Sequence, residues 1–213
     1  MKTILFQGDS ITDCGRKRDV FDNMGWGYPL LVKSQLGFDN IEEYSFINRG
    51  ISGNRVVDVY ARIKSDIINL KPDYMSILIG VNDVWHEFGA KNGVDAKKFE
   101  KIYCMLIEEI KEALPDIKIM LLEPFCLRAS ATENTEEIPD KWENFNLEVK
   151  KRAEKTKAIA EKYNLKFIPL QNKFDEVAEK SNNIYWLADG VHPTPMGHEL
   201  IKREWLKAYE QLV

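Results

Sequence analysis

The stretch ILFQGDSITDCGR, residues 4–16, decides the fold because it begins as a buried strand and stops abruptly at Gly8. A compact apolar run without polar alternation is typical of a parallel strand that helices cover on both faces. Asp9 and Ser10 follow directly at the end of this strand. Two interpretations are open. Either residue could cap the next helix by accepting backbone N–H groups, or Ser10 is a nucleophile exposed at the strand end.

Four further apolar runs predict strands at 43–48, 74–79, 117–122 and 166–169, after a first strand at 3–7. Between them, apolar residues at three- and four-residue spacing predict helices over 56–70, 99–113 and 142–163. Asp95 is expected to cap the second helix, and Asp140 with Glu143 to form a capping box at the third. The alternation of strands and helices predicts an α/β fold, a three-layer α/β/α sandwich with a five-stranded parallel sheet, as a single domain over residues 1–213. The polar stretch 128–139 is expected to form a surface loop or lid near the end of the sheet.

Composition excludes several classes of function. The net charge is −4, with 44% hydrophobic and 30% charged residues, which is ordinary for a globular protein and gives no basic surface for nucleic acid. The three cysteines, Cys14, Cys104 and Cys126, are scattered without a C-x-x-C pair. That spacing argues against a disulfide framework and against a zinc site. No metal or other cofactor is therefore expected.

The N-terminal sequence MKTILFQGDS has an apolar run of only Ile4–Phe6 before Gln7, too short for a signal peptide. No later stretch is apolar for long enough to cross a bilayer. We therefore expect a cytoplasmic protein without a membrane partner.

Ligands of parallel α/β sheets bind outside the carboxyl ends of the strands. NRGISGN (48–54) follows the second predicted strand, GVND (80–83) follows the third, and DGVHP (189–193) comes after the fifth. Each segment also has a purely structural explanation. Gly53 permits a tight turn into a helix that Asn54 caps, Asn82 suits a turn, and Asp189 caps a turn before the last helix.

Together these segments meet one chemical need. A serine hydroxyl needs a neighbouring base, and of the three histidines only His192 has a carboxylate, Asp189, three residues earlier in a Gly- and Pro-rich loop. This spacing lets Asp189 bind the Nδ1–H group of His192, so that Nε2 faces Ser10. By contrast, His198 falls in the last helical pattern, where it packs or is exposed, and His86 has no orienting carboxylate and is at most a substrate contact. The backbone N–H groups of Ser10 and Gly53 and the amide of Asn82 would form an oxyanion hole.

Gly8-Asp9-Ser10, Gly53, Asn82 and Asp189-x-x-His192 resemble the four signature blocks of the SGNH (GDSL-type) hydrolases, in the order of that family. The resemblance implies a flavodoxin-like three-layer fold, Ser10 as nucleophile, Asp189 and His192 as the rest of a catalytic triad, and Gly53 and Asn82 in the oxyanion hole. The absence of a G-x-S-x-G pentapeptide separates the chain from the α/β-hydrolases.

The segments GDSITDCGR, NRGISGNRVVDVYARI, KPDYMSILIGVNDVW and DGVHPTPMGHELI further resemble bacterial carbohydrate acetylesterases, including intracellular acetylxylan esterases. This narrower resemblance implies a small acetylated sugar as substrate and a homo-oligomer. Trp85 and Trp186 are the candidate residues for stacking on the sugar, and core or interface packing is the alternative role for both.

Two other classes of function stay open at this stage. A GDSL-type lipase, lysophospholipase or thioesterase would use the same catalytic residues with a different acyl pocket. A flavodoxin-like binding module would need a phosphate-binding glycine motif, which follows none of the predicted strands. Asp9 and Asp13 by themselves are too few ligands to indicate a metal site for phosphoryl transfer.

Overall fold

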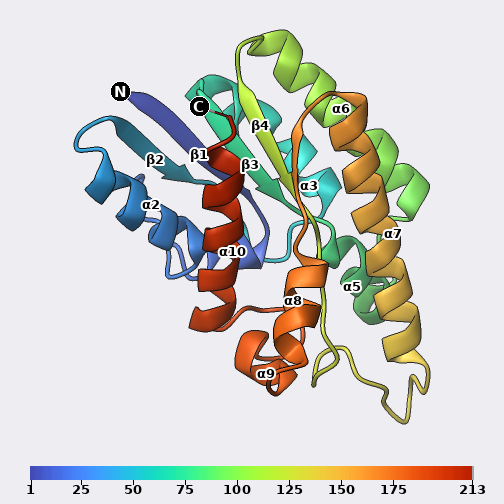
Figure 1. The fold of residues 1–213 in the computed structure, drawn as a ribbon. Helices are drawn as coiled ribbons and strands as arrows, with labels where there is room; N and C mark the ends of the chain where they lie inside the picture. The colour runs from blue at the N-terminus through green and yellow to red at the C-terminus, as the bar shows by residue number, and fades with distance from the viewer. Residues whose placement is uncertain (213) are drawn as a thin grey trace.

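The computed structural model describes residues 1–212, in which five strands form one parallel sheet in the order β2-β1-β3-β4-β5 (Figure 1). The strands are β1 (Lys2–Gly8), β2 (Tyr44–Asn48), β3 (Tyr74–Leu78), β4 (Lys118–Leu122) and β5 (Lys166–Ile168). Every predicted strand is present, with its ends within one residue of the prediction. The predicted α/β sandwich fold with its five-stranded parallel sheet is confirmed.

The two faces of the sheet carry separate apolar cores because neighbouring side chains of a strand point to opposite faces. On β1, Ile4 and Phe6 belong to one core and Leu5 to the other. Helices α2 (Tyr28–Asp39) and α10 (Pro195–Tyr209) cover the first face, and α3 (Val56–Ala61) and α6 (Ala96–Ala113) cover the second (Figure 1). The long helix α7 (Lys141–Lys162) supplies side chains to both cores.

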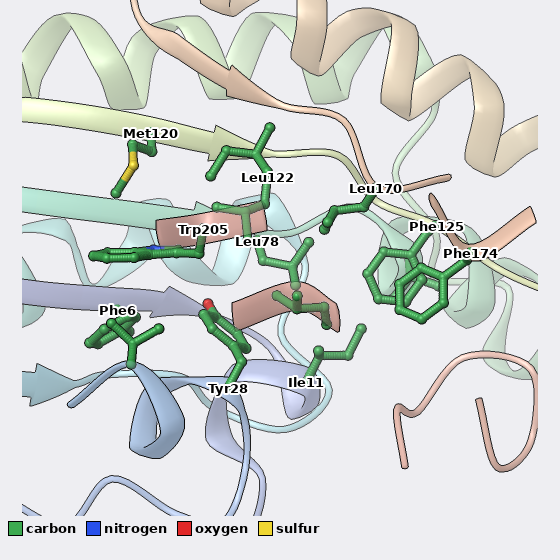
Figure 2. Close-up of a cluster of buried hydrophobic side chains, with 14 of the residues drawn as sticks. Phe6, Ile11, Tyr28, Leu78, Met120, Leu122, Phe125, Leu170, Phe174 and Trp205 are labelled. Atoms are coloured by element: carbon green, nitrogen blue, oxygen red, sulfur yellow. The ribbon is translucent and has the colours of Figure 1, made fainter. Parts of the chain in front are cut away.

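Large aromatic rings fill the first core. Figure 2 shows Trp205 of α10 lying over Phe6 of β1, with ring centroids 5.5 Å apart. Phe125, which follows β4, pairs with Phe174 of α8 (Gln171–Ala178) at 4.4 Å (Figure 2). These contacts fix α8 and α10 on the sheet, and the segment between these helices carries α9 (Asn183–Trp186) and the Asp189–His192 loop.

The helix predicted over 56–70 is broken into three pieces. After α3 come α4 (Ile63–Asp66) and the 3₁₀ helix η1 (Ile68–Leu70). The breaks fall at Arg62 and Ile67. The guanidinium of Arg62 binds the carbonyl of Arg49 at 2.8 Å and Oε1 of Gln7 at 2.6 Å. Helix α3 begins after Arg55, whose backbone N–H group donates to Oδ2 of Asp58 at 2.8 Å, so the suggested Asn54 cap is wrong.

The caps of the other two predicted helices have different outcomes. Asp95 caps α6 as predicted, accepting the N–H groups of Lys97 and Lys98 at 3.0 Å each. Asp140 is the N-cap of α7, but its side chain accepts no capping hydrogen bond from the described residues. The backbone of Asp140, at φ −117° and ψ 24°, lies outside the extended region that a capping side chain needs. The predicted capping box is therefore wrong.

The strand order places the topological switch point between β1 and β3, because the chain leaves β1 for β2 on one side and then crosses to β3 on the other. Helices α1 (Ser10–Asp13) and α5 (Val81–Ala90) start at these two strand ends. Residues 128–139 form no helix or strand, which agrees with the predicted loop. No helix within residues 1–212 is both long and apolar enough to cross a membrane.

Candidate active site

Ser10 is the first residue of α1 and is partly exposed at the carboxyl end of β1. Asp9 precedes it as the N-cap, and its Oδ1 atom accepts the N–H group of Ile11 at 3.0 Å. The two interpretations of this stretch, a helix cap and a nucleophile, therefore apply to different residues. Asp9 caps the helix, which leaves the hydroxyl of Ser10 free to contact other groups.

The structure brings Ser10, His192 and Asp189 together in one chain of hydrogen bonds. The Oγ atom of Ser10 lies 2.9 Å from Nε2 of His192, and Nδ1 of that ring lies 2.7 Å from Oδ2 of Asp189. Because an ionised carboxylate can only accept, Nδ1 carries the proton and Nε2 is free to accept from the serine hydroxyl. The other oxygen of Asp189 accepts the N–H groups of Val191 and His192, at 2.9 and 2.8 Å.

The electrostatics of this pair favour an ionised aspartate beside a basic histidine. Burial opposes the charge on Asp189, but hydrogen bonds from the His192 ring and from backbone N–H groups lower the pKa of Asp189 to about 2. The same hydrogen bond raises the pKa of His192, against the opposing effect of burial. The arrangement can therefore accept a proton at Nε2 without protonating Asp189.

The Asp189–His192 loop is supported from a segment that sequence reasoning did not connect with the site. The N–H group of Leu127 donates to the carbonyl of Gly190, and that of Ala131 donates to the carbonyl of Asp189, both at 2.9 Å. Gly190 has φ +97°, and a Cβ atom there would lie 2.5 Å from the carbonyl oxygen of Leu127. Only glycine allows this close approach. The sequence signal for this support is Gly190 in the DGVH segment, because a glycine there indicates that another backbone packs closely against the loop.

Three hydrogen-bond donors lie on the connections that follow β1, β2 and β3. The N–H groups of Ser10 and Gly53 have no acceptor among residues 1–212, which for Ser10 is expected in the first turn of a helix. Asn82 is buried in the first turn of α5 and donates one amide hydrogen to the carbonyl of Asn54 at 3.2 Å. Its second amide hydrogen has no acceptor within the described part of the chain and could bind a ligand. Asn82 thus adjoins the residue after Gly53, as expected for donors that share one site.

The other two histidines have different surroundings. His198 is buried on α10, where Nδ1 accepts the N–H group of Tyr28 at 3.1 Å and so caps α2. Because Nδ1 accepts, the proton is on Nε2, which donates to Sγ of Cys14 at 3.3 Å. Burial lowers the pKa of His198 to about 4. His86, on α5, lies beside Gly53, with Nε2 4.0 Å from the position that a Cβ atom would take there.

The structure separates the two candidate stacking residues. The ring of Trp85 lies 5.6 Å from that of His192 and packs edge-on against Phe145. By contrast, the indole N–H group of Trp186 donates to Ser181 at 2.8 Å. The Trp186 ring lines a groove between α8 and α10 together with Met196 and other residues. Trp85 therefore lies beside His192, whereas the Trp186 indole is held by Ser181 at the groove between α8 and α10.

The two aspartates near Ser10 have separate environments. Asp13 accepts hydrogen bonds from Arg18, Arg16 and Ser52. Asp9 is almost completely buried, and its Oδ2 atom has no hydrogen-bond partner within residues 1–212. Burial raises the pKa of Asp9 to about 7.

Comparisons with known proteins show the family of the chain. Residues 6–200 match the model of the GDSL-like Lipase/Acylhydrolase family. The chain is 34% identical to an acetylxylan esterase of Geobacillus stearothermophilus over 214 residues, which cover 96% of this chain and 92% of that protein. A solved structure of that esterase superposes with a TM-score of 0.83 at 33% identity, covering 97% of this chain and 93% of the other. A protein of Parabacteroides merdae described as a GDSL-like lipase gives a TM-score of 0.90 at 36% identity, covering 97% and 94% of the two chains. The resemblance seen in the four sequence blocks is thereby confirmed: the chain belongs to the GDSL-like lipase/acylhydrolase family and is a carboxylic ester hydrolase.

Proposed function

We propose that this hydrolase is a serine esterase that removes acetyl groups from small carbohydrates, with Ser10 as the nucleophile. The observation that carries the proposal is the 2.9 Å approach of Ser10 Oγ to Nε2 of His192, with Asp189 on the far side of the ring. A hydroxyl, a base and an orienting carboxylate in this order are the requirements for nucleophilic attack by serine.

In the proposed reaction, Ser10 Oγ attacks the carbonyl carbon of the acetyl ester while His192 Nε2 takes the hydroxyl proton. The tetrahedral intermediate collapses when His192 returns this proton to the sugar oxygen, which leaves as an alcohol. His192 then takes a proton from water, which attacks the carbonyl carbon of the acetyl-enzyme. The second tetrahedral intermediate collapses when His192 returns this proton to Ser10 Oγ, so that the acyl–oxygen bond breaks and acetic acid leaves as acetate and a proton. Asp189 stays ionised throughout and stabilises the imidazolium that forms twice in each cycle.

The negative oxygen of each tetrahedral intermediate would be stabilised by the N–H groups of Ser10 and Gly53 and by the amide of Asn82. Two of these donors have no acceptor among residues 1–212, so they need not break a hydrogen bond to that part of the chain to serve. Donors fixed in advance stabilise the developing charge without the reorganisation that water requires.

Support for an acetylated sugar as substrate comes from the relative at 34% identity, which is an acetylxylan esterase. Two solved structures of that esterase are described as catalytic mutants, one with a serine and one with an aspartate replaced by alanine. Trp85 beside His192 supplies an aromatic face of the kind that stacks on sugar rings. The cytoplasmic location and the homo-oligomer stay predictions.

A panel of substrates tests the proposal. Acetate release from acetylated xylo-oligosaccharides and peracetylated monosaccharides would be compared with hydrolysis of a lysophospholipid and of acyl thioesters, with Ser10→Ala as the blank. We expect the acetylated sugars to give the highest kcat/KM. Faster turnover of the lysophospholipid or of a long-chain thioester would replace the proposed substrate with a lipid or thioester. Activity retained in Ser10→Ala would overturn the proposed mechanism.

A further inference from the structure

Asp13 is a buried carboxylate for which the proposed mechanism has no role. It is the last residue of α1, the short helix that Ser10 begins, and its side chain is only 4% exposed. A buried carboxylate is costly unless it is paired and hydrogen-bonded, so its partners indicate what it does.

The partners of Asp13 come from two different segments. Its Oδ2 atom accepts the backbone N–H group of Ser52 at 2.9 Å, the hydroxyl of Ser52 at 3.3 Å and Nη2 of Arg18 at 2.8 Å. Its Oδ1 atom accepts the N–H group of Arg16 at 3.1 Å. Burial opposes the charge, but hydrogen bonds from Arg18 and Ser52 lower the pKa of Asp13 below its usual value. The carboxylate is therefore ionised and joins the end of α1 to the connection after β2.

Ser52 immediately precedes Gly53, whose N–H group belongs to the peptide unit that starts at Ser52. Gly53 has φ +82°, a conformation that only glycine adopts readily, and its N–H group has no acceptor of its own among the described residues. The direction of this N–H group therefore depends on how firmly its neighbours are held.

Other contacts hold the same connection against α1 at Gly50, two residues before Ser52. Arg16 donates to the carbonyl of Gly50 from both Nε and Nη2, at 3.3 and 2.9 Å. The two backbones are so close that a Cβ atom on Gly50 would lie 2.4 Å from the backbone nitrogen of Asp13. Among these contacts, the bond from Asp13 is the one made at the residue next to Gly53.

We propose that Asp13 is a positioning residue that fixes the Gly53 N–H group relative to the Ser10 N–H group, so that both point at the same oxyanion. This inference rests on the proposed serine mechanism. The single turn of α1 sets the distance from Ser10 to Asp13, and the carboxylate sets the distance from Asp13 to Ser52. One side chain thus couples two backbone donors that come from different strand ends. A small displacement of such a donor weakens the stabilisation of the transition state more than the binding of the ester itself.

Asp13→Asn tests the inference, because it keeps the size of the side chain but removes its charge and one acceptor oxygen. With 4-nitrophenyl acetate we expect kcat to fall about 10- to 100-fold while KM changes less than about threefold. A trifluoromethyl ketone, whose adduct with serine carries an oxyanion, should bind more weakly by the same factor as kcat/KM falls. An organophosphonate should still label one serine per chain, Ser10, at a lower rate.

Two further variants separate this role from simple stabilisation. Asp73→Asn is the matched control, because that carboxylate accepts the Thr3 N–H group at 2.7 Å at the opposite end of the sheet; its kcat should equal that of the wild type. Arg18→Gln removes the half-exposed cation from Asp13 but leaves the bond to Ser52, and kcat should stay within about threefold.

If Asp13→Asn does not fold, Asp13→Glu retains the charge but displaces the carboxylate from Ser52, and it should show the same loss of kcat and of ketone affinity. Wild-type kcat in either variant at position 13, or an equal loss in Arg18→Gln, would overturn the inference. If Ser10→Ala retained activity, the proposed mechanism itself would fail, which is distinguishable because that variant leaves Asp13 intact.

Discussion

The Nε2 atom of His192 lies 2.9 Å from the Oγ atom of Ser10, although 182 positions separate the two residues in the sequence. Ser10 is placed by the end of β1, and His192 by the loop that leads into α10. The core connects these two elements, because Trp205 of α10 packs on Phe6 of β1. The alignment of the Ser10 and His192 side chains thus depends on how α10 packs against the sheet.

The first prediction concerns the nucleophile. Ser10→Ala should abolish ester hydrolysis, because no other serine is hydrogen-bonded to His192 within the described residues, and its thermal unfolding should match that of the wild type. Intact-mass measurement after treatment with a serine-directed organophosphonate should show one adduct on the wild type and none on the variant. Peptide mapping that placed the label on Ser52 would contradict the assignment.

Asn82 provides the second prediction. Asn82→Ala should lower kcat by about two to three orders of magnitude with a smaller change in KM, because its free amide hydrogen would bind the oxygen most strongly when that oxygen is charged. The loss also includes the bond to the carbonyl of Asn54, which holds the two donor segments together. Asn40→Ala, which removes a similar amide-to-carbonyl bond at the end of α2, is the control and should keep full activity. An unchanged kcat in Asn82→Ala would show that the residue is only structural.

The dependence of activity on pH gives the third prediction. His192 must be neutral to accept a proton, and its hydrogen bond to Asp189 raises its pKa. In the wild type, kcat/KM should therefore rise with pH through an apparent pKa above the ordinary value for histidine, about 6.5. Asp189→Asn removes the charge, so this limb should shift to lower pH while kcat falls by about 10³- to 10⁴-fold. A profile of kcat/KM from pH 4.5 to 9 checks both, and an unshifted limb in the variant would argue against the pairing.

Much of this arrangement is accessible from the sequence, and the reasons are physical. Parallel strands covered on both faces are continuous apolar runs, so β1 and β3 are visible without any tertiary information. Their carboxyl ends must lie at one edge of the sheet, which brings Ser10 and Asn82 near each other. The spacing of Asp189 and His192 is short enough that a tight loop alone joins their side chains.

The parts that were not predicted depend on contacts between distant segments. The helix over 56–70 breaks because Arg62 turns toward the end of β1, a partner that no local pattern reveals. Trp186 is near His192 in sequence, but its indole is directed by Ser181 and by the groove between α8 and α10. The support of Asp189 by Ala131 likewise joins two loops whose sequences carry no shared signal.

The fourth prediction concerns stability in acid. The pKa of His198 is about 4 in the folded protein and about 6.5 when unfolded, so between these values the unfolded chain binds more protons. Relative to His198→Gln, the wild type should therefore lose up to about 3 kcal/mol of its free energy of unfolding as the pH is lowered from 6.5 to 4, because the contribution of Asp9, which has the opposite sign, is present in both proteins. Urea unfolding at several pH values should show this difference between the two proteins. Equal slopes for the two proteins would show that another group is responsible.

The last prediction concerns the substrate and uses the two tryptophans as a matched pair. A site that holds only the methyl group of an acetyl ester would clash with added methylenes, so activity on 4-nitrophenyl esters should fall steeply from acetate to butyrate and octanoate. Trp85 lies beside His192, where a sugar leaving group would sit, so Trp85→Ala should lower kcat/KM for acetylated xylo-oligosaccharides by more than tenfold, or about 1.4 kcal/mol. The same variant should affect 4-nitrophenyl acetate much less, because that ester has no sugar ring to stack. Trp186→Ala removes an equally large indole that is bound to Ser181, and it should change neither substrate selectively. Faster hydrolysis of octanoate than of acetate would indicate a lipase-like acyl groove. A selective loss in Trp186→Ala instead of Trp85→Ala would place the sugar in the groove that Trp186 lines between α8 and α10.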